Sequence, residues 1–125
     1  MIYMEVFIFV LIVSLLLIHE MDAIRVREWR MFIGLKNLHD ETAYRIFSLA
    51  HLPLYIAAFF ILASGGALAK LILYYVIDAF LIVHAIIHYG FRKNPNNGFT
   101  SLFSKAIIYS LAILAIIHLC VLLVV

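Results

Sequence analysis

Two histidines lie four residues apart in "DAFLIVHAIIHYG", a long apolar run of the sequence that also contains an aspartate. On a helix, positions i and i+4 share one face and lie about one turn apart, so His84 and His88 can both reach a single metal ion. Ionisable side chains inside an apolar helix are costly unless they pair or serve a function. The spacing therefore indicates a metal-binding helix face.

The composition places these helices in a membrane. Of the 125 residues, 67% are hydrophobic and 13% are charged, whereas a soluble domain has about 45–50% apolar residues. About 20 mostly apolar residues cross a bilayer, and four runs are long enough to do so: residues 2–22, 44–64, 69–91 and 102–125. The sequence predicts an all-α fold, a four-helix transmembrane bundle that forms one membrane domain over residues 1–125.

The connection between the first two runs has a different pattern. Val26, Trp29, Phe32 and Ile33 recur at helical spacing among charged residues. This pattern is typical of an amphipathic segment that lies on the membrane surface, with Trp29 at the level of the lipid headgroups. The sequence has no cluster of basic residues interleaved with exposed aromatics, so it gives no indication of nucleic-acid binding. Its one cysteine, Cys120, excludes a cysteine-based zinc motif.

The basic residues predict the orientation of the chain. All nine Lys and Arg residues except Lys70 fall next to the first or third connection, and cytoplasmic loops carry an excess of such residues. These eight residues are Arg25, Arg27, Arg30, Lys36, Arg45, Arg92, Lys93 and Lys105. We therefore expect an integral protein of the plasma (inner) membrane, with both termini outside and the first and third connections in the cytoplasm.

Four imidazoles from three predicted helices share one depth in the membrane. At a rise of ~1.5 Å per helical residue, each lies about 6–12 Å inside the nearest cytoplasmic basic residue. A lone membrane histidine often only hydrogen-bonds a neighbouring helix, but four such bonds at one depth is the less economical explanation. We predict a divalent metal ion, zinc or iron, bound by His19, His51, His84 and His88.

Two carboxylates beside His19 are the predicted catalytic residues. Asp22, three positions further on, shares the helix face of His19 and can act as a ligand or orient its imidazole. Glu20 points about 100° away and can shuttle protons if its face turns inward. The alternative for both is a solvated carboxylate where the helix leaves the membrane.

A second level of polar groups is expected deeper in the bilayer. Asp78 lies about 21 Å from Arg92, and His118 lies about 20 Å from Lys105, by the same rise. The two are therefore candidates to pair with each other. On the third predicted helix a stripe of residues with steps of four and three faces the bundle: Tyr74, Asp78, Leu81, Ala85 and His88.

Three segments of the sequence are specific in combination: "HEMDAIRVREWRMF", "DETAYRIFSLAHLPL" and "DAFLIVHAIIHYGFRKNPNNGF". Together they resemble a family of small bacterial membrane proteins with four spans, a domain of unknown function (DUF6713). The resemblance implies the four-span layout and no activity. It also implies that seven residues belong to the family's pattern: His19, Glu20, Asp22, His51, Asp78, His84 and His88.

Three functions remain open at this point. The first is a metal-dependent membrane enzyme acting on a lipid-like substrate, in which zinc favours hydrolysis and iron favours oxidation of an acyl chain. The second is a haem b electron carrier in which two histidines on facing helices ligate the iron. The third is a structural or accessory membrane subunit whose polar residues hold helices together. A homo-oligomer is compatible with all three.

Overall fold

The computed structural model describes residues 2–124 and contains four long helices within that range. These are α1 (Ile2–Arg25), α2 (Asp40–Ser64), α3 (Ala67–Gly90) and α4 (Leu102–Val124). Two short 3-10 helices, η1 (Glu28–Met31) and η2 (Phe91–Lys93), lie in the connections. All four long helices are apolar enough and long enough to cross a membrane. The predicted all-α four-helix bundle is therefore confirmed.

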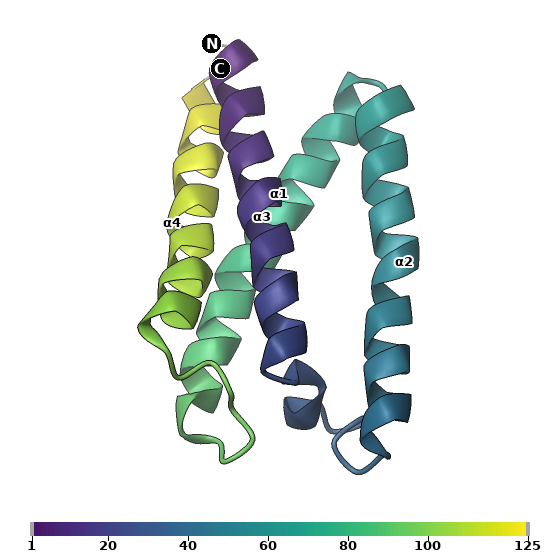
Figure 1. Cartoon of the computed structure of the whole chain (residues 1–125). Coiled ribbons are helices and arrows are strands. Elements are labelled where there is room, and N and C mark those ends of the chain that lie inside the picture. Colours follow the sequence, from purple (N-terminus) through teal and green to yellow (C-terminus); the bar gives the residue numbers. More distant parts are fainter. Residues whose placement is uncertain (1, 125) are drawn as a thin grey trace.

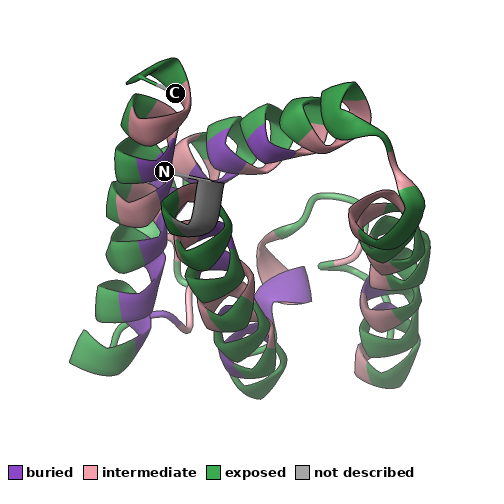
Figure 2. Ribbon diagram, turned by 90° about the horizontal axis from the view of Figure 1, so that it is seen from above, coloured by how far each residue is buried: buried purple, intermediate pink, exposed green. Residues whose placement is uncertain are grey.

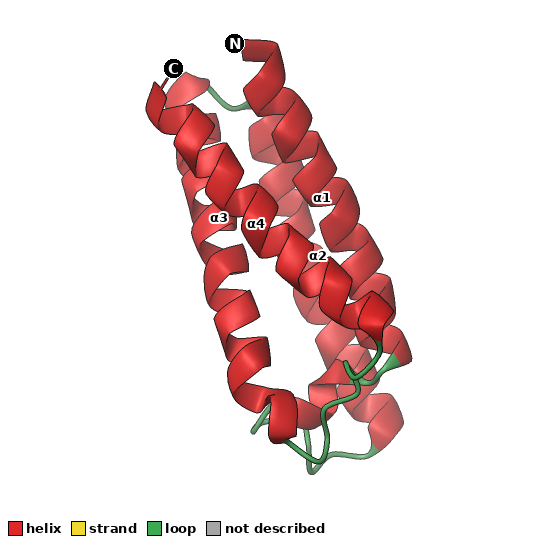
Figure 3. Ribbon diagram, turned by 90° about the vertical axis from the view of Figure 1, so that its left-hand side faces the viewer, coloured by secondary structure: helices red, strands yellow, loops and turns green. Residues whose placement is uncertain are grey.

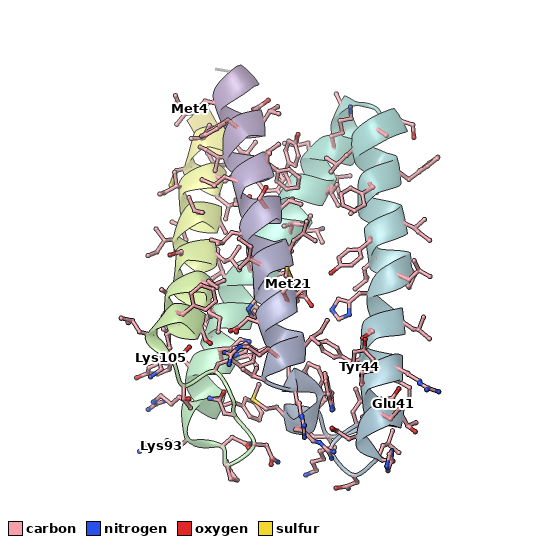
Figure 4. The ribbon with its side chains drawn as sticks, in the orientation of Figure 1. Met4, Met21, Glu41, Tyr44, Lys93 and Lys105 are labelled. Carbon is pink, nitrogen blue, oxygen red and sulfur yellow. The ribbon has the colours of Figure 1, made fainter. Side chains whose placement is uncertain are left out.

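The helices alternate in direction, and the connections gather at the two ends of the bundle (Figure 3). Both termini lie at one end, where Gly65 and Gly66 also join α2 to α3 (Figure 1). The first and third connections lie together at the opposite end. Figure 4 shows Lys93 and Lys105 there, far from Met4 at the other end. We call this end, which carries most of the Lys and Arg residues, the basic end.

Three of the four helices form the packed core. α4 packs along both α1 and α3, whereas α2 contacts α3 and η1 much less extensively. The view along the bundle shows α2 set apart from the other three helices (Figure 2). Only 6% of the apolar window of α2 is buried, against 28% for α1 and for α4. A space therefore separates α2 from α1 and α3 along much of its length. Two pockets lie in this space, each lined by residues of α1, α2 and α3.

The predicted inward stripe of α3 is confirmed. The buried residues of that helix are Tyr74, Asp78, Leu81, Ala85 and His88. Leu81 packs in the middle of the bundle against Ile12 of α1 and Leu111 of α4. Because side chains three and four positions apart share one helix face, burying Leu81 and Ala85 also turns His88 towards the interior.

The first connection folds back on the bundle, unlike the predicted surface segment. Trp29 is only 4% exposed, and its indole N–H donates to Asp40 Oδ1 at 2.9 Å. Its ring packs against Phe47 of α2. Arg30 also binds Asp40, at 2.6 Å. The Trp29 side chain is therefore buried in the protein instead of exposed on its surface, because Asp40 and Phe47 supply partners for its polar and apolar parts.

The third connection is held close to the first. A Cβ at Gly98 would lie 2.6 Å from Val26 Cβ and 2.8 Å from the Val26 carbonyl oxygen, so only glycine allows this approach. The next residue, Phe99, is 3% exposed and belongs to the core of the basic end, together with Ala23 and Ile108. This contact places an aromatic ring directly under the histidines of α1 and α3.

Candidate metal centre

Four side chains converge near the basic end of the bundle. They come from α1, η1 and α3, and one potential ligand atom of each lies within 4.8 Å of all the others: His19, Glu28, His84 and His88. His84 Nε2 lies 2.9 Å from His19 Nε2 and 3.0 Å from His88 Nε2. The nearest carboxylate oxygen, Glu28 Oε1, lies 3.2 Å from His88 Nε2. We call this group the four-ligand cluster.

The spacing of the nitrogens suits a common metal ion. Zinc–nitrogen bonds are about 2.0–2.1 Å long, so two imidazole nitrogens on one tetrahedral ion lie about 3.3 Å apart. The observed nitrogen separations are slightly shorter, at 2.9 and 3.0 Å. Shifts of a few tenths of an ångström in these side chains therefore open the cluster to a bound ion.

The proton count at the cluster also favours a cation. A neutral imidazole nitrogen offers either one proton or one lone pair. His84 Nε2 faces two other ring nitrogens, so it can complete only one of the two contacts as an ordinary hydrogen bond between neutral rings. A bound cation satisfies the lone pairs of all three nitrogens at once.

The cluster is enclosed on most sides. His19, Glu28 and His88 are 1%, 5% and 6% exposed, and His84 is half-buried. The ring of Phe99 stacks on His19 with a centroid separation of 5.4 Å and meets His88 edge-on at 4.6 Å. Phe80 stacks on His84 with a centroid separation of 5.2 Å. Packing on the two phenylalanines orients the three rings before any ion binds.

Glu28 supplies negative charge to the cluster. Burial opposes ionisation of its carboxyl group, but the hydrogen bond with His88 and the neighbouring imidazoles outweigh burial and hold its pKa below the ordinary value. The group is therefore a carboxylate at neutral pH. Three imidazoles and one carboxylate form a donor set that both zinc and iron accept.

The outer nitrogens of two ligands lack protein partners. Among the described residues, Nδ1 of His19 and Nδ1 of His88 are buried without a hydrogen-bond partner. In many metal sites that nitrogen donates to a carboxylate or a carbonyl group, which orients the ring. Packing against Phe99 takes over this orienting role here.

His51, predicted as a fourth ligand, lies outside the four-ligand cluster. Its Nε2 lies 3.1 Å from Glu20 Oε2, and its Nδ1 donates to the Phe47 carbonyl oxygen at 2.7 Å. With Nδ1 protonated, the Nε2–carboxylate contact needs one further proton, carried either by the imidazole or by Glu20. Glu20 and His51 therefore form an acid–base pair in hydrogen-bond contact.

A pocket connects this pair with the cluster. It has a volume of about 380 Å³ and lies between α2 and the helices α1 and α3. Its polar lining comes from the pair and from three cluster residues: Glu20, Glu28, His51, His84 and His88. The remainder of the lining is apolar and includes Phe32, Phe47, Phe80 and Phe91. We call it the cluster pocket.

Asp22, the other predicted catalytic carboxylate, points away from the cluster pocket. It is 4% exposed, and its Oδ1 lies 2.7 Å from the Arg25 guanidinium group. That guanidinium also reaches Ser104 of α4, at 3.4 Å. Asp22 thus holds Arg25, which contacts the start of α4, and Asp22 does not line the cluster pocket.

Asp78 and His118, the predicted second level, lie in contact. His118 Nδ1 is 2.7 Å from Asp78 Oδ2, and both residues are 0% exposed. Phe9 and Tyr74 pack against the imidazole, with ring separations of 5.6 and 5.3 Å. The pair links α3 to α4 in the interior, separate from the cluster.

Glu28 was not among the site residues predicted from the sequence, because a continuous helix would place it on the face opposite His19. Glu28 is nine positions after His19, and at about 100° per residue this corresponds to the opposite face of the helix. The chain instead leaves α1 after Arg25 and turns at Arg27, whose φ of 58° and ψ of 55° are left-handed. Such a backbone costs a non-glycine residue roughly 1–2 kcal/mol. Ion pairs from Arg27 and Arg30 to Asp40 hold the turn that brings Glu28 back to the histidines.

The chain belongs to a family with no assigned activity. The model of the family described as "Family of unknown function (DUF6713)" matches residues 5–125. No curated protein and no solved structure matches the chain. Any function must therefore be inferred from the site itself.

Proposed function

We propose that this member of a family of unknown function is a membrane enzyme that holds a divalent metal ion in the four-ligand cluster and acts on a lipid-like substrate. One observation carries the proposal: three imidazole nitrogens and one carboxylate oxygen converge within 4.8 Å in an enclosed, preorganised site. Ionisable groups inside a membrane protein are expensive and are a functional-site hypothesis by default.

The cluster pocket supports an enzyme over a purely structural metal site. Its volume of about 380 Å³ falls in the usual range for small-molecule sites, about 300–1,000 Å³. Its lining combines aromatic side chains with a few convergent polar groups, which suits a molecule that has an apolar chain and a polar reacting group. It lies between helices that face the bilayer, so a lipid can enter from the side.

The pair of Glu20 and His51 supplies the proton transfer that such a reaction needs. It lines the same pocket as the proposed metal ligands, and its imidazole nitrogen and carboxylate oxygen lie 3.1 Å apart. A group that gives or takes a proton in this way typically contributes about 10²–10⁴-fold to a rate. Glu20 and His51 are therefore the proposed acid–base residues, and Asp22 has a positioning role.

The metal and the reaction are linked. His19, Glu28, His84 and His88 would hold the ion. Zinc would supply a water nucleophile for hydrolysis, whereas iron would supply oxidation of an acyl chain with dioxygen as the oxidant. Identification of the bound metal therefore separates the two reactions.

The geometry favours a single ion over haem b. Two axial imidazoles need about 4 Å between their nitrogens, twice a ~2 Å metal–nitrogen bond, with the porphyrin plane between them. The cluster nitrogens are 2.9 and 3.0 Å apart and leave no room for a porphyrin. An accessory subunit without a cofactor remains the alternative function.

We expect the protein purified in detergent without chelators to contain about one divalent ion per chain, because an all-protein donor set binds such ions tightly. Elemental analysis measures the metal, and an absorbance scan of the same sample detects haem. A stoichiometric amount of zinc or iron without a haem band is the expected result. A metal-free sample that also fails to bind added zinc or iron contradicts the proposal, and a haem spectrum replaces it.

We also propose an orientation in the plasma (inner) membrane with the basic end in the cytoplasm and both termini outside. The excess of Lys and Arg at that end supports this orientation. A reporter that is active only in the cytoplasm should give no signal when it is fused after Val125, and should give full signal when it is inserted after Asn37, in the first connection. The reverse pattern of signals would contradict the orientation.

A further inference from the structure

Another hollow, distinct from the cluster pocket, lies at the basic end and carries positive charge. It has a volume of about 370 Å³ and lies between the end of α3, the third connection and the start of α4. Its lining includes three cations and four neutral side chains with an amide or hydroxyl group: Arg92, Lys93, Lys105, Tyr89, Asn97, Thr100 and Tyr109. Figure 4 shows Lys93 and Lys105 on the same side of the molecule. We call this hollow the basic pocket.

The cations of the basic pocket have no carboxylate partner among residues 2–124. Elsewhere at this end the arginines have carboxylate partners: Arg25 with Asp22, Arg27 and Arg30 with Asp40, and Arg45 with Glu41. No described carboxylate lies within 4.0 Å of Arg92, Lys93 or Lys105. The sequence after Asp78 contains no Asp or Glu at all, so the partner anion must come from outside this part of the chain.

The excess of positive charge on cytoplasmic loops explains why these residues are basic but not why they surround one hollow. Arg92 is held in place there, since its guanidinium donates to the Tyr89 carbonyl oxygen at 2.8 Å and lies 3.9 Å from the centre of the Tyr89 ring. A planar guanidinium fixed in this way is preorganised for a phosphate oxygen. The neutral polar groups Asn97, Thr100 and Tyr109 offer additional donors.

We propose that the basic pocket binds a phosphate group, either that of an anionic phospholipid or free phosphate. The pocket lies at the ends of two apolar spans, which is the depth of the lipid headgroups, and basic pockets between membrane helices are known headgroup sites. The inference goes beyond the proposed function because it requires no metal. His88 also lines the basic pocket, so a phospholipid bound there lies beside the four-ligand cluster.

The test measures phosphate binding by the full chain in detergent. Native mass spectrometry with phosphatidylglycerol follows the lipid, and phosphatidylcholine, whose choline neutralises its phosphate, is the comparison lipid. Line broadening in phosphorus NMR with inorganic phosphate follows the free ion. Lys105→Gln and Arg92→Gln are each expected to weaken the binding about fivefold, since one basic residue near an anionic surface contributes about that factor.

Lys36→Gln is the matched control, since Lys36 is an exposed cation at the same end and does not line the pocket. Binding of phosphatidylglycerol that is weakened by Lys105→Gln and unchanged by Lys36→Gln supports a headgroup site. The same pattern with inorganic phosphate, without preference for the lipid, supports a free-phosphate site. The proposal is overturned if Lys36→Gln weakens binding as much as the pocket variants do. It is also overturned if binding stays complete in the triple variant Arg92→Gln, Lys93→Gln, Lys105→Gln. The Lys105 side chain makes no hydrogen bond or ion pair with a described residue, so its single variant stays interpretable if the triple variant does not fold.

Discussion

Replacing His88 by Ala is expected to weaken metal binding at least ~100-fold, because even partners outside the ligand shell are worth about 10–100-fold. His88 contributes one of the four converging atoms and contacts both His84 and Glu28. The variant should therefore lose its metal during purification, whereas the wild-type chain keeps it. Elemental analysis after gel filtration measures the difference.

Stability provides a second readout that separates metal loss from a packing defect. A ligand at 1,000 times its Kd stabilises a protein by about 4.1 kcal/mol, so a chelator should lower the melting temperature of the wild-type protein. The His88→Ala and Glu28→Gln variants should melt at the same temperature with and without chelator. Packing damage alone would lower the melting temperature but leave the chelator effect intact.

Two control variants test the assignment of ligands. His51→Ala should keep the metal, because the His51 imidazole contacts Glu20 and not the cluster. His39→Ala should also keep it, since His39 precedes α2 and is exposed. Full metal occupancy in both His84→Ala and His88→Ala, or loss of the metal in His51→Ala alone, would contradict the proposed ligand set.

Depth along the helices was predictable from the sequence, because the rise per residue and the position of the basic residues fix it. This reasoning placed His19, His51, His84 and His88 in one layer, and Asp78 and His118 in a deeper one. The step of four and three along α3 predicted which of its side chains face inward. The described structure has the same inward face.

Lateral position was not predictable in the same way. His51 shares the depth of the cluster, but α2 stands away from α1 and α3, so its imidazole meets Glu20 across the cluster pocket instead of joining the ligands. The distance between helices depends on side chains from several elements, which periodicity in one helix does not encode. Depth therefore predicted the layer, and tertiary packing decided which histidines meet.

The first connection was the least predictable part of the site. Its helical spacing of apolar residues suggested a surface helix, whereas the left-handed turn at Arg27 and the contacts of Asp40 fold it inward. These contacts bury both Trp29 and Glu28. A single non-glycine residue in a left-handed conformation leaves no signal in the sequence, so the carboxylate of the cluster could not be assigned before the structure.

Replacing either member of the buried pair Asp78 and His118 is expected to cost about 3–5 kcal/mol of unfolding free energy, the usual loss when one partner of a buried ion pair is removed. Both side chains are 0% exposed, and they lie 2.7 Å apart. Each single change leaves the other group buried without its partner. Reversible unfolding of the purified variants in mixed detergent micelles measures the loss.

The double variant Asp78→Asn with His118→Ala should lose less stability than the sum of the losses in the two single variants, because the second change removes a group that has already lost its partner. The expected coupling energy is about 0.5–3 kcal/mol. Asp78→Asn combined with His39→Ala is the matched cycle, in which the histidine is exposed and precedes α2. That cycle should be additive. Additivity in the Asp78 and His118 cycle would mean that the pair does not stabilise the packing of α3 on α4. Because the pair lies apart from the four-ligand cluster, its variants should keep their metal even where they lose stability.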